Sequence, residues 1–142
     1  MIISHPKTVY SFLGFFVLLA VVDWELRSGL IAWPHMVCNT GIGLGLAIPS
    51  SILWLSITLL LCIAGYQAWT RSALIDCLAW MTIFIGGAVN AIDRSVHGCV
   101  TDYIALPFFP SFNLADMMLF LGVALLLVTT LGMMPKVSAY VR

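Results

Sequence analysis

Four long apolar stretches dominate the chain, and segments rich in glycine, proline and polar residues separate them. A membrane helix needs about 20 mostly apolar residues. The first stretch resembles the apolar core of a signal peptide in length, but no small-residue cleavage site follows it, so we interpret it as a retained helix. The pattern therefore predicts four membrane-spanning helices, at residues 9–26, 51–69, 73–92 and 114–134.

Two larger segments, 27–50 and 93–113, connect the predicted helices, together with one tight polar turn around Arg71. The first segment contains the run NTGIGLGL, in which glycine alternates with apolar residues. Such alternation favours short strands or an extended hairpin at the membrane interface over a helix. The expected fold is a single all-α integral membrane domain over residues 1–142, with a small extended cradle in its first outer loop.

Composition and charge agree with this class. The chain is 62% hydrophobic and 8% charged, whereas soluble domains average about 25% charged residues. It has no basic run that would indicate nucleic-acid binding. Four spans place two groups of basic residues on opposite sides: Lys7, Arg71, Lys136 and Arg142 on one, Arg27 and Arg94 on the other. The positive-inside rule then makes the termini cytoplasmic and puts both large loops on the outer side.

The segment from Gly86 to Asp116 concentrates the polar chemistry, because it holds three of the five aspartates of the chain. A carboxylate near hydrocarbon costs about 2.5–3.5 kcal/mol on insertion scales, so these residues need partners, water or a function. Asp102 follows the third predicted helix, within the second large loop, and Asp116 opens the fourth helix. Two such carboxylates can hydrolyse an amide if one, ionised, takes a proton from water while the other, protonated, polarises the carbonyl.

Structural explanations compete with this hypothesis. Asn113 and Asp116 have the spacing of a helix N-cap with an acid at the third helical position. Asn90 and Asp93 share one helical face, and with Arg94 they could form a buried polar cluster. Alternatively, Asp93 and Arg94 are an ordinary ion pair at a helix end.

Other polar and aromatic residues give weaker signals. His97 lies in the predicted second loop, and His5 and His35 are isolated, so we expect no catalytic histidine. The aromatic run at 107–112 could cover a lipid-bearing substrate or simply anchor the loop at the interface. The cysteines lack zinc-ligand spacing, which predicts no metal site and no cofactor. Whether Cys38 and Cys99 form a disulfide is left undecided, because such a bond depends on an oxidising outer side.

Several motifs together resemble the signal peptidase II family, the lipoprotein signal peptidases of bacteria. The most specific are GGAVNAIDR at 86–94, the G-x-V-x-D pattern of Gly98 to Asp102, and FNLAD at 112–116. They occur in the family's order and on the same side of the four predicted spans. The chain resembles a short, divergent member, since Arg27 stands where the family usually has lysine.

This resemblance implies an inner-membrane aspartic endopeptidase with its active site at the outer face. Such enzymes cut signal peptides from diacylglyceryl-modified prolipoproteins, within membrane lipid, and are the target of globomycin-type inhibitors. Asp102 and Asp116 match the family's catalytic pair. Positions that line or support that site are matched by Asn39, Gly41, Asn90, Asp93, Arg94, Asn113 and Asp23.

Two other functions are compatible with the pattern. A small proton-coupled transporter would use an embedded carboxylate, but only Asp76 lies inside a predicted span, near the end opposite to the other acids. A catalytically inactive relative could bind lipoprotein precursors, although the intact Asp102 and Asp116 argue against it.

Overall fold

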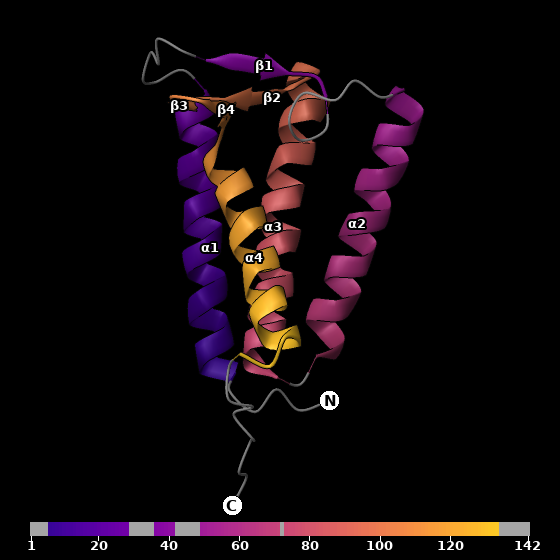
Figure 1. Ribbon diagram of the computed structural model, residues 1–142, viewed down its shortest axis with the longest axis vertical. Coiled ribbons are helices and arrows are strands. Elements are labelled where there is room, and N and C mark those ends of the chain that lie inside the picture. Colours follow the sequence, from indigo (N-terminus) through magenta and orange to yellow (C-terminus); the bar gives the residue numbers. More distant parts are fainter. Residues whose placement is uncertain (1–5, 29–35, 42–48, 72, 134–142) are drawn as a thin grey trace, which may run out of the picture.

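The computed structural model describes residues 6–28, 36–41, 49–71 and 73–133. Within them the chain forms four helices and four short strands. The helices run along the long axis of the molecule, and the strands gather at one end of it (Figure 1). Pro6, which opens the first helix, and Thr130, which closes the last, lie at the opposite end. The predicted class, a helical membrane protein with a small extended region, is confirmed.

The helices are α1 (Pro6–Arg27), α2 (Ser50–Thr70), α3 (Leu74–His97) and α4 (Leu114–Thr130). The first three are long and apolar enough to cross a membrane, whereas α4 is a shorter apolar helix. Many large apolar side chains on α1, α2 and α4 face outward, as expected where lipid rather than water surrounds a helix. The predicted fourth segment reached residue 134, but α4 ends four residues earlier and a turn follows it.

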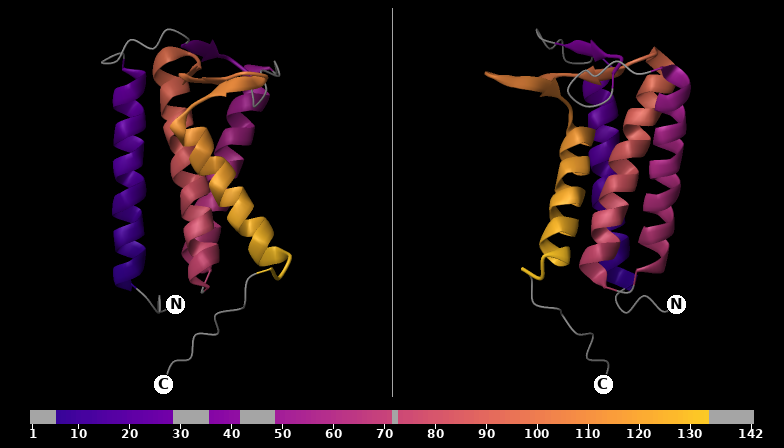
Figure 2. Two further views of the ribbon diagram at one scale, coloured as in Figure 1. Left: turned by 60° about the vertical axis from the view of Figure 1, so that its left-hand side comes forward. Right: turned by 45° about the vertical axis from the view of Figure 1, so that its right-hand side comes forward.

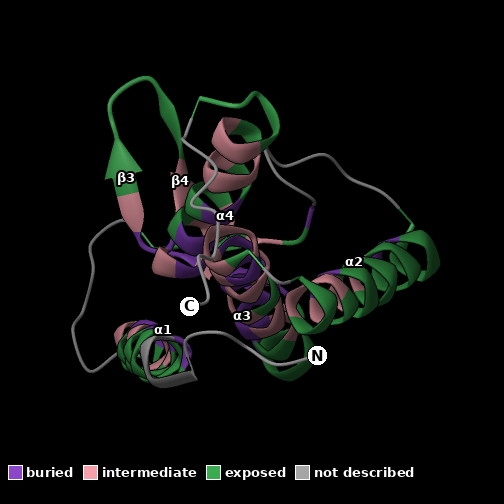
Figure 3. Cartoon of the chain, turned by 90° about the horizontal axis from the view of Figure 1, so that it is seen from below, coloured by how far each residue is buried: buried purple, intermediate pink, exposed green. Residues whose placement is uncertain are grey.

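Helix α3 lies between the other three helices (Figure 3). Its closest neighbour is α4, and glycine makes this approach possible. A Cβ atom on Gly86 would stand 2.7 Å from the carbonyl oxygen of Ala115, and one on Gly122 would stand 2.8 Å from that of Ala79. Because neither glycine has a side chain, the two backbones pack against each other directly. This contact fixes α4, which carries Asp116, against α3, which carries Asn90.

Helix α3 continues to His97, five residues beyond the end predicted at 92. Asp93, Arg94 and His97 therefore lie on its last turns and not in a loop. The helix ends at Gly98, whose φ of 78° is left-handed, a conformation that glycine adopts readily. The prediction stopped early because these polar residues resemble a loop, whereas Asp93 is in fact completely buried in the structure.

The strands form two small antiparallel sheets. Strand β1 (Val37–Asn39) pairs with β2 (Val100–Asp102), and β3 (Ile104–Leu106) pairs with β4 (Phe109–Phe112). The first sheet therefore joins the two large loops, since β1 comes from the first and β2 from the second. Most of the glycine-alternating run, at 42–46, lies outside the described residues. The hairpin of β3 and β4 projects sideways from the end of the helix bundle (Figure 2).

Candidate active site

Asp102 and Asp116 reach the site from different elements. Asp102 is the last residue of β2, and Asp116 lies in the first turn of α4. Asn113 caps α4 and connects the two. Its side-chain oxygen accepts from the backbone N–H of Asp116 at 2.9 Å, while its side-chain nitrogen donates to Asp102 Oδ1 at 2.7 Å. The predicted capping box is confirmed, and it fixes both carboxylates through one asparagine.

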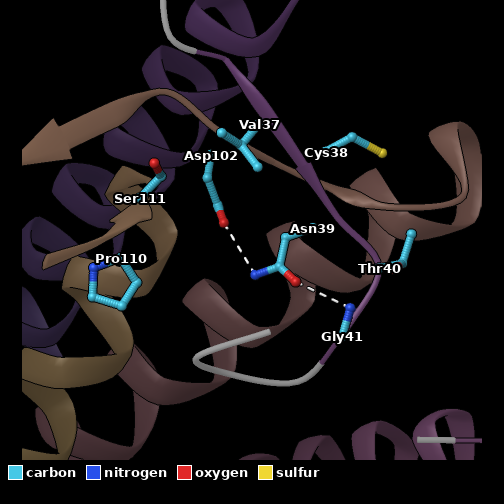
Figure 4. A pocket seen from close by; sticks show the side chains of 8 residues that line it. All are labelled: Val37, Cys38, Asn39, Thr40, Gly41, Asp102, Pro110 and Ser111. Carbon is cyan, nitrogen blue, oxygen red and sulfur yellow. Dashed lines mark hydrogen bonds between the residues drawn. The ribbon is translucent and has the colours of Figure 1, made fainter. Parts of the chain in front are cut away.

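Neutral amide groups hold every oxygen of the two carboxylates. Asn39 donates to Asp102 Oδ2 at 3.2 Å, opposite the bond from Asn113 (Figure 4). Asn90 donates to Asp116 Oδ1 at 2.7 Å, and the backbone N–H of Asn113 donates to Asp116 Oδ2 at 3.3 Å. In the described part of the chain, neither carboxylate forms a salt bridge. These hydrogen bonds hold each carboxylate in position, but unlike a salt bridge they do not supply a positive charge that favours the ionised form.

The other two aspartates of this end are held differently. Asp23 and Asp93 are both completely buried, and both pair with the guanidinium of Arg27. Asp93 also accepts from His97 Nδ1 at 2.6 Å and from the backbone N–H of Thr101 at 2.6 Å. These ion pairs and hydrogen bonds fix the two carboxylates in position inside the bundle. Asp93 was predicted to pair with Arg94, but that prediction is wrong, since Arg94 instead donates to the carbonyl oxygen of Gly41 at 2.8 Å.

Arg27 also orients an amide of the site. Its Nη2 donates to the side-chain oxygen of Asn90 at 2.8 Å. The other end of that amide, the nitrogen, therefore faces Asp116. The chain Arg27–Asn90–Asp116 links the buried ion cluster to the candidate dyad. This role was not predicted, because Arg27 stands out in the sequence only as a basic residue between two spans and as a departure from the family pattern. The i, i+4 spacing from Asp23 to Arg27 was the available signal.

Asp23 fixes the start of α4 as well. Its Oδ1 accepts from the backbone N–H groups of Leu114 and Ala115, at 3.1 and 3.3 Å, and from the Tyr103 hydroxyl at 2.7 Å. A carboxylate at a helix N-terminus is favoured by the unpaired N–H groups there. Helix α1 thereby sets the position of the turn that carries Asp116. Tyr103, which the sequence analysis also missed, directly follows Asp102 and is 4% exposed.

Burial raises the pKa of two groups of the site, Asp102 and Tyr103. It raises the pKa of Asp102 above its ordinary value; the hydrogen bonds from Asn39 and Asn113 oppose the rise, and the nearby Asp116 adds to it. Burial, followed by the bond to Asp23, also raises the pKa of Tyr103, so its hydroxyl stays a donor. Asp102 is thus suited to hold a proton at a pH at which an ordinary aspartate is ionised.

A cavity of about 340 Å³ opens beside Asp102. Strand β1 with the residues after it forms one wall, and β4 supplies another (Figure 4). The wall of β1 is itself braced, because the side-chain oxygen of Asn39 accepts from the backbone N–H of Gly41 at 3.0 Å. Asp102, which is only 2% exposed, thus lines a cavity of the protein and is not enclosed by packed side chains on every side.

A disulfide joins the two strands of this wall. Cys38 lies in β1, Cys99 directly precedes β2, and their Cα atoms are 5.5 Å apart. The strand register places Cys38 opposite Thr101, one residue from Asp102. The bond left open by the sequence analysis is therefore formed. It ties Asn39 to the strand of the carboxylate that this asparagine holds.

We expect loss of this disulfide to destabilise the site. Cys38→Ser should lower the free energy of unfolding by up to about 4 kcal/mol in the chain-entropy treatment of a loop of this length. Thermal unfolding in detergent, with and without a reductant, measures the effect. Cys62→Ser is the control, since Cys62 is a free, exposed cysteine of α2. Equal unfolding midpoints for both variants would contradict a stabilising role.

Comparison with known proteins adds to this geometry. A model of the family described as Signal peptidase (SPase) II matches residues 13–132, which is most of the chain. The chain belongs to the signal peptidase II family. Lipoprotein signal peptidases of Yersinia pestis (strain Pestoides F) and Yersinia pseudotuberculosis serotype O:3 (strain YPIII) are each 38% identical to it over 78 residues. That match covers 51% of this chain and 45% of the relative.

Solved structures agree on the fold. A bacterial membrane enzyme determined in meso at 2.3 Å resolution superposes with a TM-score of 0.78 at 22% identity, covering 94% of this chain and 96% of that one. A second, at 1.9 Å resolution, gives 0.74 at 22% identity, with 87% and 94% covered. The fold of this signal peptidase II family member is thus shared over nearly its whole length.

Proposed function

We propose that this family member is a membrane aspartic endopeptidase that removes signal peptides from diacylglyceryl-modified prolipoproteins. The observation that carries the proposal is the division of the aspartates. Asp23 and Asp93 each form a salt bridge with Arg27, whereas Asp102 and Asp116 are held only by amide groups. Two carboxylates close in space, without cations, share protons more readily than they lose both.

The proposed reaction uses water as the nucleophile. The ionised member of the Asp102–Asp116 pair takes a proton from water as the oxygen attacks the scissile carbonyl. The protonated member donates a hydrogen bond, then its proton, to the carbonyl oxygen. As the tetrahedral intermediate collapses, the first carboxyl gives its proton to the leaving nitrogen, and the second carboxylate takes a proton from one of the two hydroxyls, so that the pair regains its starting charge. Asn39, Asn90 and Asn113 would keep both carboxylates oriented while their charges exchange.

Two features support placement of this site at the outer face of a bacterial inner membrane, with cytoplasmic termini. The Cys38–Cys99 disulfide suits an oxidising compartment. The basic residues at the other end, which include Arg71, favour the cytoplasmic side. A substrate anchored by lipid would keep its acyl chains in the bilayer beside the helices and bring its peptide to the cavity near Asp102.

Cleavage of a lipid-modified precursor tests the proposal. The purified protein in proteoliposomes should cut a diacylglyceryl-modified prolipoprotein directly before the modified cysteine, as mass spectrometry of the two products would show. The same precursor without the lipid group is the matched control and should be cut far more slowly. Equal cleavage of both, or of neither, would contradict the assignment.

The pH dependence of cleavage should be bell-shaped, because the pair needs one proton and titrates as a unit. The rate rises with pH as the first proton leaves and falls as the second leaves. Because the pKa of Asp102 is raised, the falling limb should lie above the ordinary range of aspartate. Asn39→Ala removes a bond that lowers this pKa, so it should move that limb to higher pH. An unmoved limb would contradict the role of Asn39.

A further inference from the structure

The hairpin of β3 and β4 has no charged side chain and an apolar tip. Leu106, Phe108 and Phe109 are 53%, 108% and 61% exposed. We define these residues with Pro107 as the hairpin tip. Viewed from the side and along the bundle, the hairpin extends outward past α4 instead of folding back on the helices (Figures 2 and 3). An exposed apolar patch of this kind is typical of an interaction surface.

The backbone of the tip strengthens this view. Pro107 and Phe108 form the turn, and Phe108 has a φ of 64°. It is the one non-glycine residue with positive φ in the described part of the chain. Glycine or asparagine suits this position of a turn, whereas a bulky L-residue is strained there. The fold thus holds a phenylalanine in an unfavourable conformation, and the exposure of its ring shows that packing within the chain does not offset that strain.

The position of the tip indicates what covers it. The hairpin leaves the bundle at the end where α4 begins, and α4 carries exposed apolar side chains from this end onward, with Met117 48% and Phe120 77% exposed. The tip therefore continues the apolar surface of α4 outward at the level of the helix ends. Aromatic side chains are enriched at this depth of a membrane.

We propose that the hairpin tip inserts into the outer interface of the bilayer, beside α4. Strand β4 begins at the tip with Phe109, and its next residues, Pro110 and Ser111, line the active-site cavity. A tip bedded in lipid would hold this wall at a fixed depth relative to the membrane. The consequence for cleavage, which rests on the proposed function, is that the hairpin aligns the cavity with lipid-anchored substrates.

Photocrosslinking tests the insertion without any assay of activity. Phe108 is replaced by p-benzoylphenylalanine, the protein is irradiated in phospholipid vesicles, and adducts are identified by mass. We expect phospholipid adducts at position 108, as at the lipid-facing Phe120. Met36, just before β1, is the control expected to give none. Absence of lipid adducts at 108 when Phe120 forms them would overturn the proposal, as would adducts only with an added lipidated peptide.

Substitutions at the turn test the consequence. Phe108→Asn removes the ring but suits the positive φ, so its unfolding midpoint should equal or exceed that of the parent. Its cleavage rate should fall in vesicles and not in detergent micelles, and Phe108→Trp should keep the parental rate in both. Equal loss in both media would overturn the link to lipid. A parent that cleaves nothing would refute the proposed function and leave the crosslinking result standing.

Discussion

Replacing Asp102 or Asp116 by asparagine should lower the cleavage rate of a lipid-modified precursor by at least about 100-fold, the lower range for loss of general acid–base catalysis. Each substitution leaves one carboxyl and removes the exchange of a proton between two. Single-turnover cleavage in proteoliposomes measures the effect. A parental rate in either variant would contradict the dyad.

These two variants should nevertheless fold. In Asp102→Asn, one amide–amide contact becomes unfavourable, since both Asn39 and Asn113 donate to the carboxylate. The substitution also replaces a group whose ionised form is disfavoured by burial, as the raised pKa of Asp102 shows. A raised pKa means that the stability contributed by this group is present below the ordinary pKa and is lost as pH rises through the folded value. At neutral pH the two changes offset each other, so we expect a stability within about 1 kcal/mol of the parent.

Asp93→Asn should destabilise the protein, unlike the substitutions at Asp102 and Asp116. It leaves the guanidinium of Arg27 buried with one anionic partner, Asp23, in place of two. A buried hydrogen bond between charged groups is typically worth about 1.5–3 kcal/mol, and the substitution turns the one from Arg27 to Asp93 into a bond with a neutral amide. We therefore expect a clear drop in the thermal unfolding midpoint in detergent, because the neutral amide oxygen also accepts more weakly from the backbone N–H of Thr101, the bond that ties α3 to β2.

Glu25→Gln is the matched control for that variant. Glu25 is a carboxylate of the same helix as Arg27, but it is exposed. Its substitution should change stability by less than about 0.5 kcal/mol. If Asp93→Asn were as stable as Glu25→Gln, the division into structural and catalytic aspartates would be wrong.

The helices and the polar end of the molecule could be predicted from the sequence because both are local signals. Long apolar runs define α1 to α4 without tertiary information, and the spacing of Asn113 and Asp116 encodes its own cap. The resemblance to the signal peptidase II family supplied the pairing of Asp102 with Asp116. Their spacing alone, across a loop, did not require them to converge.

The non-local partners could not be predicted. Arg27 bonds to Asn90 and Asp93, more than sixty residues away along the chain, so neither contact leaves a periodic trace. The adjacent Arg94 offered a more obvious partner for Asp93. Only the packing of α1 against α3 determines which arginine faces the carboxylate.

The strands were underestimated for a similar reason. Strand β1 pairs with β2 from the other large loop, and a three-residue strand is too short to be recognised from its own alternation. The hairpin of β3 and β4 turns at Pro107 and Phe108, where the turn-forming glycine or asparagine that usually marks such a position is absent. The aromatic run at 107–112 is evident in the sequence, but nothing in it indicates that this segment forms a hairpin.

The proton shared by Asp102 and Asp116 can be measured directly by infrared difference spectroscopy of the protein in lipid. A protonated carboxyl has a C=O stretch distinct from the bands of a carboxylate. Near neutral pH the parent should show such a band, and both Asp102→Asn and Asp116→Asn should lose it, while Glu25→Gln keeps it. A parent without the band, or a band that persists in both dyad variants, would contradict a proton-sharing pair.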